Sequence, residues 1–353
     1  MDLDDCRKKI DEVDHQIVDL LNERLLVTKE VGKIKQNLNE EFYVPEREKK
    51  IFEKLEAFNK GPLTNKSLRA IFREVISAGI ANQKPLTIAY FGPEGTFTHQ
   101  AAVTNFGSSV SYVPYRSIQN VFVAVEKSEA DYGVVPIENS TDGAITHSLD
   151  QLSASNLKII AQVLQKIDLC LISQSAFNDI KRVYSIRYAL AQCQEWLTRN
   201  LPHAELLEAT STTHAIELAK ASDDSAAVAG KLASTLYDAP VVAEGIQDLK
   251  DNCTRFLIIA KNVPGGSTEG DFRTSITLTT KHEHGSLSKI LKIFADESIN
   301  LLQIESRPIR GKLWEYAFFI DIEGHWLNHN VAQAIEKVTP LTTSIKWLGS
   351  YPA

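Results

Sequence analysis

The chain has 353 residues, a length typical of two or three domains rather than one. Hydrophobic residues make up 43% and charged residues 24%, which excludes general disorder, and the net charge of −7 argues against a general nucleic-acid binder. No apolar run approaches the roughly 18 residues of a membrane helix, and four scattered cysteines without a C-x-x-C pair favour a reducing, cytoplasmic location without a metal site.

The N-terminal segment is rich in charge and is predicted to be helical. Thirty-one of the first 83 residues are charged, a density that predicts a separate all-α domain over residues 1–84. Apolar residues recur at helical spacing over 3–37, which predicts one long helix. Pro45 fits the first turn of a second helix over 45–59, and a third is expected over 64–83. Three helices make a thin core, so pairing with a second copy is expected.

Two cations of the first predicted helix lie on one face. Arg24 and Lys35 are eleven residues apart, which places them about 20° apart around the helix and about 16 Å apart along it. Together they could hold a small dianion; the alternative is that both are solvated surface charges. Arg7 lies about 100° from Arg24 around the helix, so it would serve such a pocket only in a partner chain.

Several motifs of this segment resemble the all-helical chorismate mutase family: Cys6-Arg7-Lys8-Lys9-Ile10-Asp11-x-x-Asp14, Glu23-Arg24, Val31-Gly32-Lys33-Ile34-Lys35, Pro45-x-Arg47-Glu48 and Gln83. That family forms an intertwined dimer in which one arginine reaches the other subunit. The resemblance implies six residues that bind chorismate: Arg7 and Arg24 at its carboxylates, Lys35 and Gln83 at its ether oxygen, and Arg47 and Glu48 at the substrate end and its hydroxyl.

The implied reaction, chorismate to prephenate, is a pericyclic rearrangement in which no proton moves. The enzyme has to hold the substrate and stabilise charge on the breaking ether oxygen, so cations and an amide suffice. Two positions depart from the family pattern. Val44 stands where an aspartate is common, and Gly79 where a small hydroxyl residue is common.

The segment 86–262 alternates strand-like and helix-like runs, which predicts an α/β domain with a largely parallel sheet, built as one domain or two lobes. The expected strands are 86–91, 132–137, 158–164, 181–184, 226–229 and 255–260. Hydroxyls, amides and one arginine gather at the ends of strands, where ligands of open α/β sheets bind, so a small oxygenated acid is the expected ligand. No dinucleotide, P-loop or zinc motif occurs, so no cofactor is expected.

Three motifs of this segment resemble prephenate dehydratase: Gly92-Pro93-Glu94-Gly95-Thr96-Phe97-Thr98-His99-Gln100-Ala101-Ala102, Pro136-Ile137-Glu138-Asn139-Ser140-x-x-Gly143 and Thr254-Arg255-Phe256. The family fold is two α/β lobes, like a periplasmic binding protein, with the active cleft between them. Further family cleft positions are matched by Ser185, Gln192, Cys193, Ser211 and Thr212.

The resemblance implies that Thr254 hydrogen-bonds the hydroxyl that leaves prephenate. Arg255 would orient an anion or brace the loop, and Glu138 and His99 are both candidates for a titratable group behind Thr254. Residues 186–188 read Ile-Arg-Tyr where the family usually has His-Pro-Gln. Two alternatives stay open: a chain with one decayed active site, and a sensor that binds prephenate without catalysis.

A turn-rich linker over 263–271 precedes a predicted α+β domain over 272–353. Its expected order is strand 274–280, helix 286–296, strands 300–310 and 313–322, helix 331–338 and strand 344–348, a ferredoxin-like βαββαβ pattern. This order resembles the regulatory ACT domain, as do two motifs, Gly285-Ser286-Leu287 and Glu305-Ser306-Arg307-Pro308. They imply an L-phenylalanine site at a domain–domain interface; the alternative is a purely structural dimerisation domain.

Together these resemblances imply a cytoplasmic, bifunctional enzyme of phenylalanine biosynthesis. It would convert chorismate to prephenate and prephenate to phenylpyruvate, under feedback inhibition by L-phenylalanine. A homodimer or homotetramer is expected, with no nucleic-acid or membrane partner.

Overall fold

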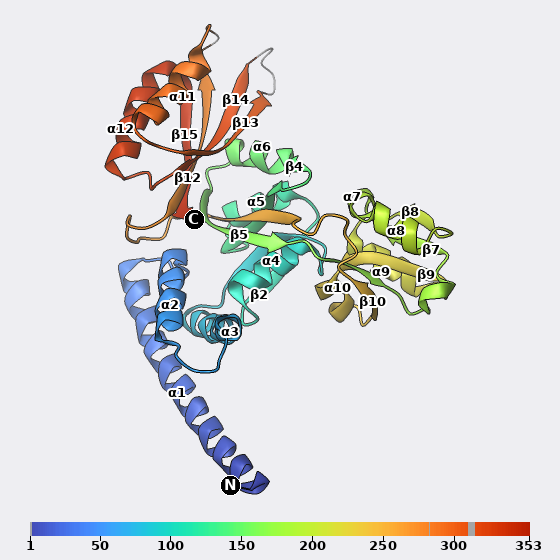
Figure 1. Cartoon of the computed structure of the whole chain (residues 1–353). Helices are drawn as coiled ribbons and strands as arrows, with labels where there is room; N and C mark the ends of the chain where they lie inside the picture. Colours follow the sequence, from blue (N-terminus) through green and yellow to red (C-terminus); the bar gives the residue numbers. More distant parts are fainter. Residues whose placement is uncertain (1, 282, 310–314) are drawn as a thin grey trace.

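The N-terminal region is three helices, and one of them projects far from the rest of the molecule (Figure 1). The computed structural model describes residues 2–281, 283–309 and 315–353. The helices, α1 (Leu3–Leu38), α2 (Pro45–Phe58) and α3 (Asn65–Gln83), confirm the prediction. Asp2 closes a capping box on α1, and the Thr64 side chain caps α3. Within the described residues, no helix is both long and apolar enough to cross a membrane.

The helical region shares its core with the next domain. Tyr43, Phe52, Ile76 and Ile80 are buried in one apolar cluster with residues of the following sheet. The Tyr43 hydroxyl lies 2.8 Å from Asn105 Nδ2, which donates to it. The helices α2 and α3 are therefore fastened to the α/β domain, whereas most of α1 is exposed.

The middle segment forms two lobes, each built on its own sheet. The first sheet has the order β2-β1-β3-β11-β5, with β4 beside β3. Its strands are β1 (Thr87–Phe91), β2 (Ser111–Tyr115), β3 (Tyr132–Asn139), β4 (Gly143–Ala144), β5 (Lys158–Lys166) and β11 (Cys253–Ala260). Its helices are α4 (Phe97–Phe106), α5 (Ile118–Glu126) and α6 (Thr146–Ala154).

The second sheet has the order β10-β6-β9-β7-β8. Its strands are β6 (Leu169–Ile172), β7 (Arg182–Ser185), β8 (Glu205–Glu208), β9 (Ser225–Gly230) and β10 (Val241–Glu244). Its helices are α7 (Arg187–Gln192), α8 (Gln194–Asn200), α9 (Thr212–Lys220) and α10 (Lys231–Leu236). The chain enters this lobe after β5 and leaves it before β11, so two lobes, not one domain, are present.

The prediction of largely parallel sheets is wrong. In the first lobe β1 is parallel to β2 and β3, but β11 is antiparallel to both β3 and β5. In the second lobe β6 is antiparallel to β9 and β10. In the first sheet the reason is the second crossing between the lobes, because β11 returns from the second lobe and runs in the opposite direction to its neighbours.

The C-terminal domain has the predicted βαββαβ order. Its elements are β12 (Phe272–Thr280), α11 (Ser286–Asp296), β13 (Leu301–Pro308), β14 (Tyr316–Glu323), α12 (His329–Val338) and β15 (Thr342–Pro352). The antiparallel sheet has the order β13-β14-β12-β15. The predicted strands 300–310 and 313–322 also include residues 310 and 313–314, which lie outside the described residues.

One face of this sheet packs on α11 and α12, and the other packs on the first lobe. Phe319, Leu348 and Tyr351 belong to the same buried cluster as residues of α5 and α6. At Gly349 the backbones approach closely, because a Cβ added there would lie 2.0 Å from the carbonyl oxygen of Ile159 on β5. The C-terminal domain is therefore docked on the first lobe (Figure 1).

Candidate functional site

Arg24 and Lys35 on α1 are half-buried cations held by backbone carbonyls. Arg24 Nη1 donates to the Val75 carbonyl at 3.1 Å, and Lys35 Nζ donates to the carbonyls of Glu41 and Phe42 at 2.9 and 3.1 Å. Burial lowers the pKa of both side chains. Among ion pairs between described residues neither cation takes part, so the direct contacts of both are with carbonyl oxygens, and Glu40 and Glu41 raise the pKa of Lys35 against the effect of burial. A pair of this kind suits an anionic ligand.

Gln83, at the end of α3, lies against Gly32 on α1, between the positions of the two cations. A Cβ added at Gly32 would lie 3.0 Å from the Gln83 side chain. Gln83 Nε2 donates to the Gly79 carbonyl at 3.3 Å, and its Oε1 is buried without a partner. A Cβ added at Gly79 would lie 3.1 Å from Arg24 Nη1, so the glycine makes room for this arginine.

The other three predicted mutase residues make different contacts. Glu48 is buried, and its Oε2 accepts a hydrogen bond of 2.6 Å from Arg73 Nη1 while its Oε1 has no partner. Burial raises the pKa of Glu48, and Arg73 acts in the opposite direction. Arg47 is exposed. Arg7 is also exposed, pairs with Asp4 at 3.3 Å, and lies about 25 Å from Arg24 along the helix.

Thr254 and Asn139 form the polar centre of the first lobe. Asn139 Oδ1 accepts hydrogen bonds from the backbone N–H groups of Thr141 and Asp142, at 2.9 and 3.1 Å. These two donors fix the orientation of the amide, so its Nδ2 faces Thr254 Oγ1 and Asn252 Oδ1, each at 2.8 Å. Because Asn139 donates to the Thr254 oxygen, the threonine proton is free to be donated to a ligand.

Two helix N-termini meet where the lobes touch. Thr96 caps α4, and Ser211 caps α9 ahead of Thr212. A Cβ added at Gly95 would lie 2.9 Å from Thr213 Cγ2, and Gly95 has a φ of 81°, so glycine is required at this contact. Paired helix N-termini favour an anion. A second contact between the lobes is a hydrogen bond of 3.1 Å from Gln192 Nε2 to Asp142 Oδ2.

Several predicted cleft residues have other partners. Ser185 is fully buried and donates to the Val228 carbonyl at 2.6 Å, and Phe256 lies in the apolar core. Ser140 is exposed and accepts a hydrogen bond from the Cys253 amide at 3.0 Å. Arg255 points away from Thr254, toward the C-terminal domain, where its Nη1 donates to Asp321 Oδ2 at 2.7 Å.

The two titratable candidates behind Thr254 are engaged elsewhere. His99 Nδ1 accepts a hydrogen bond from the Gly95 amide at 3.1 Å, and its ring stacks on Tyr90 with centroids 4.7 Å apart. Burial lowers the pKa of His99, which favours the neutral ring. Glu138 Oε2 lies 3.4 Å from Arg255 Nε. Both side chains therefore brace neighbouring groups.

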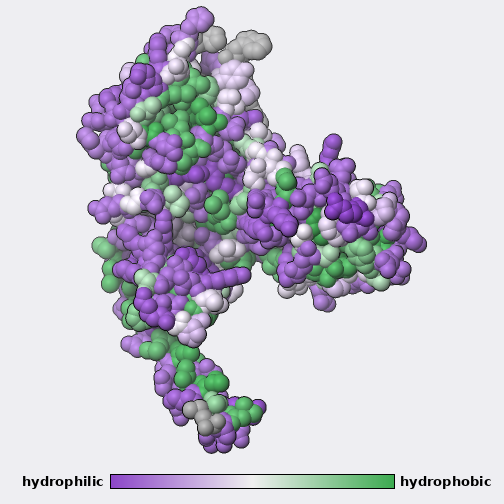
Figure 2. All heavy atoms as spheres, in the orientation of Figure 1, coloured by the Kyte–Doolittle hydropathy of each residue, from purple (hydrophilic) through white to green (hydrophobic). Residues whose placement is uncertain are grey.

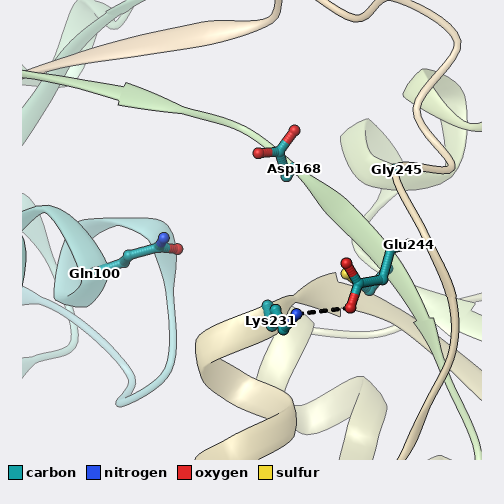
Figure 3. A pocket seen from close by; sticks show the side chains of 6 residues that line it. Gln100, Asp168, Lys231, Glu244 and Gly245 are labelled. Atoms are coloured by element: carbon teal, nitrogen blue, oxygen red, sulfur yellow. Dashed lines mark hydrogen bonds and ion pairs between the residues drawn. The ribbon is translucent and has the colours of Figure 1, made fainter. Parts of the chain in front are cut away.

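A pocket of about 400 Å³ lies between the lobes, lined by Gln100 on α4 and by Asp168, Cys170, Lys231, Glu244 and Gly245 of the second lobe. Lys231 and Glu244 form an ion pair of 2.7 Å across its wall, opposite Gln100 (Figure 3). No pattern in the sequence groups these residues. Asn252, which directly precedes Cys253 and Thr254 in the sequence, was not among the predicted site residues, although its Nδ2 is buried without a partner.

The C-terminal domain holds a pocket of about 270 Å³. It is lined by Gly285, Ser286 and Leu287 together with Tyr316 and Phe318 on β14, among others. The strand that carries Glu305, Ser306, Arg307 and Pro308 lies at the edge of the sheet and does not line this pocket. Arg307 Nη2 instead lies 3.4 Å from Asp150 Oδ1 on α6. One chain therefore brings only the first of the two predicted motifs to the pocket.

Comparisons with known proteins follow the same three regions. The family models that match are chorismate mutase type II over residues 6–84, prephenate dehydratase over 88–264 and the ACT domain over 274–339. The bifunctional chorismate mutase/prephenate dehydratase of Aquifex aeolicus is 43% identical, covering 99% of this chain and 98% of that relative. That of Neisseria gonorrhoeae is 39% identical, covering 98% and 96%.

A solved structure extends the comparison to the fold. Prephenate dehydratase from Arthrobacter aurescens, in complex with L-Phe, is similar to this chain with a TM-score of 0.71 and 31% identity, covering 76% of this chain and 90% of that one. The similarity in sequence spans nearly the whole chain, and all three domains follow in the same order. The chain therefore belongs to the family of bifunctional chorismate mutase/prephenate dehydratase enzymes, with a C-terminal ACT domain.

Proposed function

We propose that this chain converts chorismate to prephenate on its helical domain and prephenate to phenylpyruvate in its two-lobed domain. The observation that carries the proposal is that one chain holds both a pair of cations without carboxylate partners and an oriented threonine hydroxyl. The first suits a dicarboxylate, and the second suits a hydroxyl that has to leave. The full-length similarity to bifunctional relatives supports the same pair of steps.

In the mutase step Arg24 binds a carboxylate, and Lys35 and Gln83 face the ether oxygen. A cation that faces the breaking C–O bond stabilises the negative charge that builds there, and this stabilisation is larger in a site shielded from water. Glu48 Oε1, which has no partner, accepts a hydrogen bond from the substrate hydroxyl, and the exposed Arg47 anchors the substrate end. Arg7 comes from a second copy.

In the dehydratase step Thr254 donates its proton toward the departing hydroxyl while the ring carboxylate leaves as carbon dioxide. A threonine hydroxyl is a weak acid, so it acts as a donor within a hydrogen-bonded chain. Asn139 orients Thr254, and the N-termini at Thr96 and Ser211 bind carboxylate oxygens of prephenate. Ser140, Ser185, Gln192, Thr212 and Phe256 shape the surroundings of that site.

A second copy of the chain completes the molecule. The exposed side of α1 carries a row of apolar residues, namely Leu3, Ile10, Val13, Ile17, Leu20, Leu21, Val27, Val31 and Ile34. Figure 2 shows apolar patches along this projecting helix. A single helix with such a face is stable in water only when a partner covers it. The chain thus acts as a homodimer or homotetramer, in the cytoplasm, where its four free cysteines stay reduced.

L-phenylalanine binds the C-terminal domain and lowers the dehydratase rate. The pocket at Gly285–Leu287 supplies an aromatic wall, Phe318, and the motif of Glu305 to Pro308 closes the site from a neighbouring chain. The L-Phe complex of the Arthrobacter aurescens relative supports this ligand. An effector of this kind works only if it binds the two states of the enzyme unequally.

The test adds chorismate to the purified chain and follows prephenate and phenylpyruvate together. Thr254→Ala is expected to abolish phenylpyruvate formation and to leave the mutase step intact, and Arg24→Ala is expected to do the reverse. Loss of both activities from either change would contradict two separate sites. Tight prephenate binding without release of carbon dioxide would instead identify a sensor.

A further inference from the structure

Thr254 and Arg255 are neighbours on β11, and their side chains point to opposite faces of the sheet, as successive residues of a strand do. Thr254 Oγ1 accepts a hydrogen bond of 2.8 Å from Asn139 on one side. Arg255 on the other side enters the interface with the C-terminal domain. Two adjacent residues therefore connect the proposed dehydratase centre to that interface.

The partner of Arg255 is a fully buried carboxylate, Asp321 on β14. Arg255 is 4% exposed and Asp321 0% exposed, and their contact is 2.7 Å. Arg255 Nη2 also donates to Gln303 Oε1 on β13. The second oxygen of Asp321 accepts from Ser275, and Arg273 Nη1 lies 3.5 Å from the first. A buried charge that loses its partner is strongly unfavourable, so each side chain holds the other in one position.

Docking of the C-terminal domain has other supports. β15 lies directly against β5 at Gly349, and Lys346 Nζ donates to the carbonyls of Leu152 and Ser153 at 3.1 and 2.8 Å. A buried ion pair adds little to stability compared with well-packed apolar residues. Because the pair lies beside Thr254, we infer that its role is to position this part of β11 rather than to stabilise the fold.

We propose that Asp321 is a positioning residue for the dehydratase step. It fixes the Arg255 side chain, and Arg255 in turn fixes the β11 backbone that carries Thr254. This inference rests on the proposed role of Thr254. It gives the C-terminal domain a part in the dehydratase geometry when no effector is bound, and it assigns Arg255 to bracing the strand rather than to holding prephenate.

The test is steady-state kinetics on full-length Asp321→Asn, Arg255→Gln and the double variant. Each single change is expected to lower dehydratase kcat at least about tenfold, with KM for prephenate within about threefold of wild type. The double variant is expected to be no slower than the slower single variant, because both changes disrupt the same contact. Mutase kcat, measured in the same samples, stays at the wild-type value and reports that the chain is folded.

Lys346→Met is the matched control, because it removes a cation from the same interface without touching β11, and its dehydratase kcat is expected to stay near wild type. An unchanged kcat in Asp321→Asn would overturn the proposal, as would a raised KM confined to Arg255→Gln. Parallel loss of mutase activity would also overturn it, since that result indicates a general structural role. A wild-type chain that forms no phenylpyruvate overturns the proposed function itself, which is a different result.

Discussion

Asn139 uses every hydrogen-bonding position of its amide, two as acceptor and two as donor. Asn139→Ala removes this partner from the buried side chains of Thr254 and Asn252 and from two backbone N–H groups of exposed residues, at a cost of about 1–3 kcal/mol for each buried group. We expect dehydratase kcat to fall about 10–100-fold, with the mutase rate unchanged, in an assay of both steps. Asn120→Ala, on the exposed side of α5, serves as the control. A wild-type rate in Asn139→Ala would contradict the role of this amide in orienting Thr254.

Lys35 should make the mutase step sensitive to alkaline pH. Burial lowers the pKa of its ammonium group and outweighs the opposite effect of Glu40 and Glu41, so the proton is lost at a lower pH than from a free lysine. The charged form is the one that stabilises the ether oxygen, so the rate is expected to fall as pH rises through this lowered pKa. Rates at increasing pH would check this. Lys35→Arg should remove the decline, since guanidinium keeps its proton, and Lys33→Arg on the exposed face should not.

At the scale of elements, the contact between β15 and β5 depends on Gly349. A side chain there would collide with the Ile159 carbonyl, which is rigid backbone. Gly349→Ala is expected to lower the free energy of unfolding by about 1–3 kcal/mol. It is also expected to make the linker at residues 263–271 more accessible to protease. Urea unfolding and limited proteolysis would measure both. Gly265→Ala is the control, because no atom lies within 4 Å of its added Cβ; equal effects of the two changes would refute the argument.

Elements with strong apolar runs or caps were predictable from the sequence. The helices of the first domain and the βαββαβ order both emerged from periodicity and turn residues. The short strands β2, β4, β6, β8 and β10 were missed. β8, for example, has just four residues and places mainly exposed side chains at the sheet edge, so it carries no clear hydrophobic signal. The antiparallel pairing of several strands was also missed, because the direction of a strand depends on the path of the chain between the lobes.

In the candidate sites, too, the residues within local sequence patterns were predicted and those outside them were not. Local motifs singled out Thr254 and Asn139, and helical spacing placed Arg24 and Lys35 on one face. The partner Asp321 was not found, because its contact joins residues brought together by folding: Asp321 lies 66 positions from Arg255. Long-range pairing of this kind leaves no local pattern in the sequence.

At the scale of the whole molecule, the proposed dimer predicts that mixed chains recover activity. Arg7→Ala and Arg24→Ala should each lose the mutase step. If Arg7 reaches the partner's site, a mixed dimer holds one site with both defects and one site with none. Subunits exchanged by refolding a one-to-one mixture should then regain roughly a quarter of wild-type mutase sites. No recovery, with exchange verified by tagged chains, would place Arg7 and Arg24 in one chain's site.

The apolar cluster that joins the helical and α/β domains makes the short connector at residues 84–86 a poor place to divide the protein. Tyr43, Ile76 and Ile80 lie in that cluster, so a protease cut after Lys84 would not release two soluble fragments. The nicked halves would stay together and elute as one particle. If the two halves were expressed from separate genes, each would expose an apolar surface to water. Replacing the cluster residues by polar ones would be needed to avoid this.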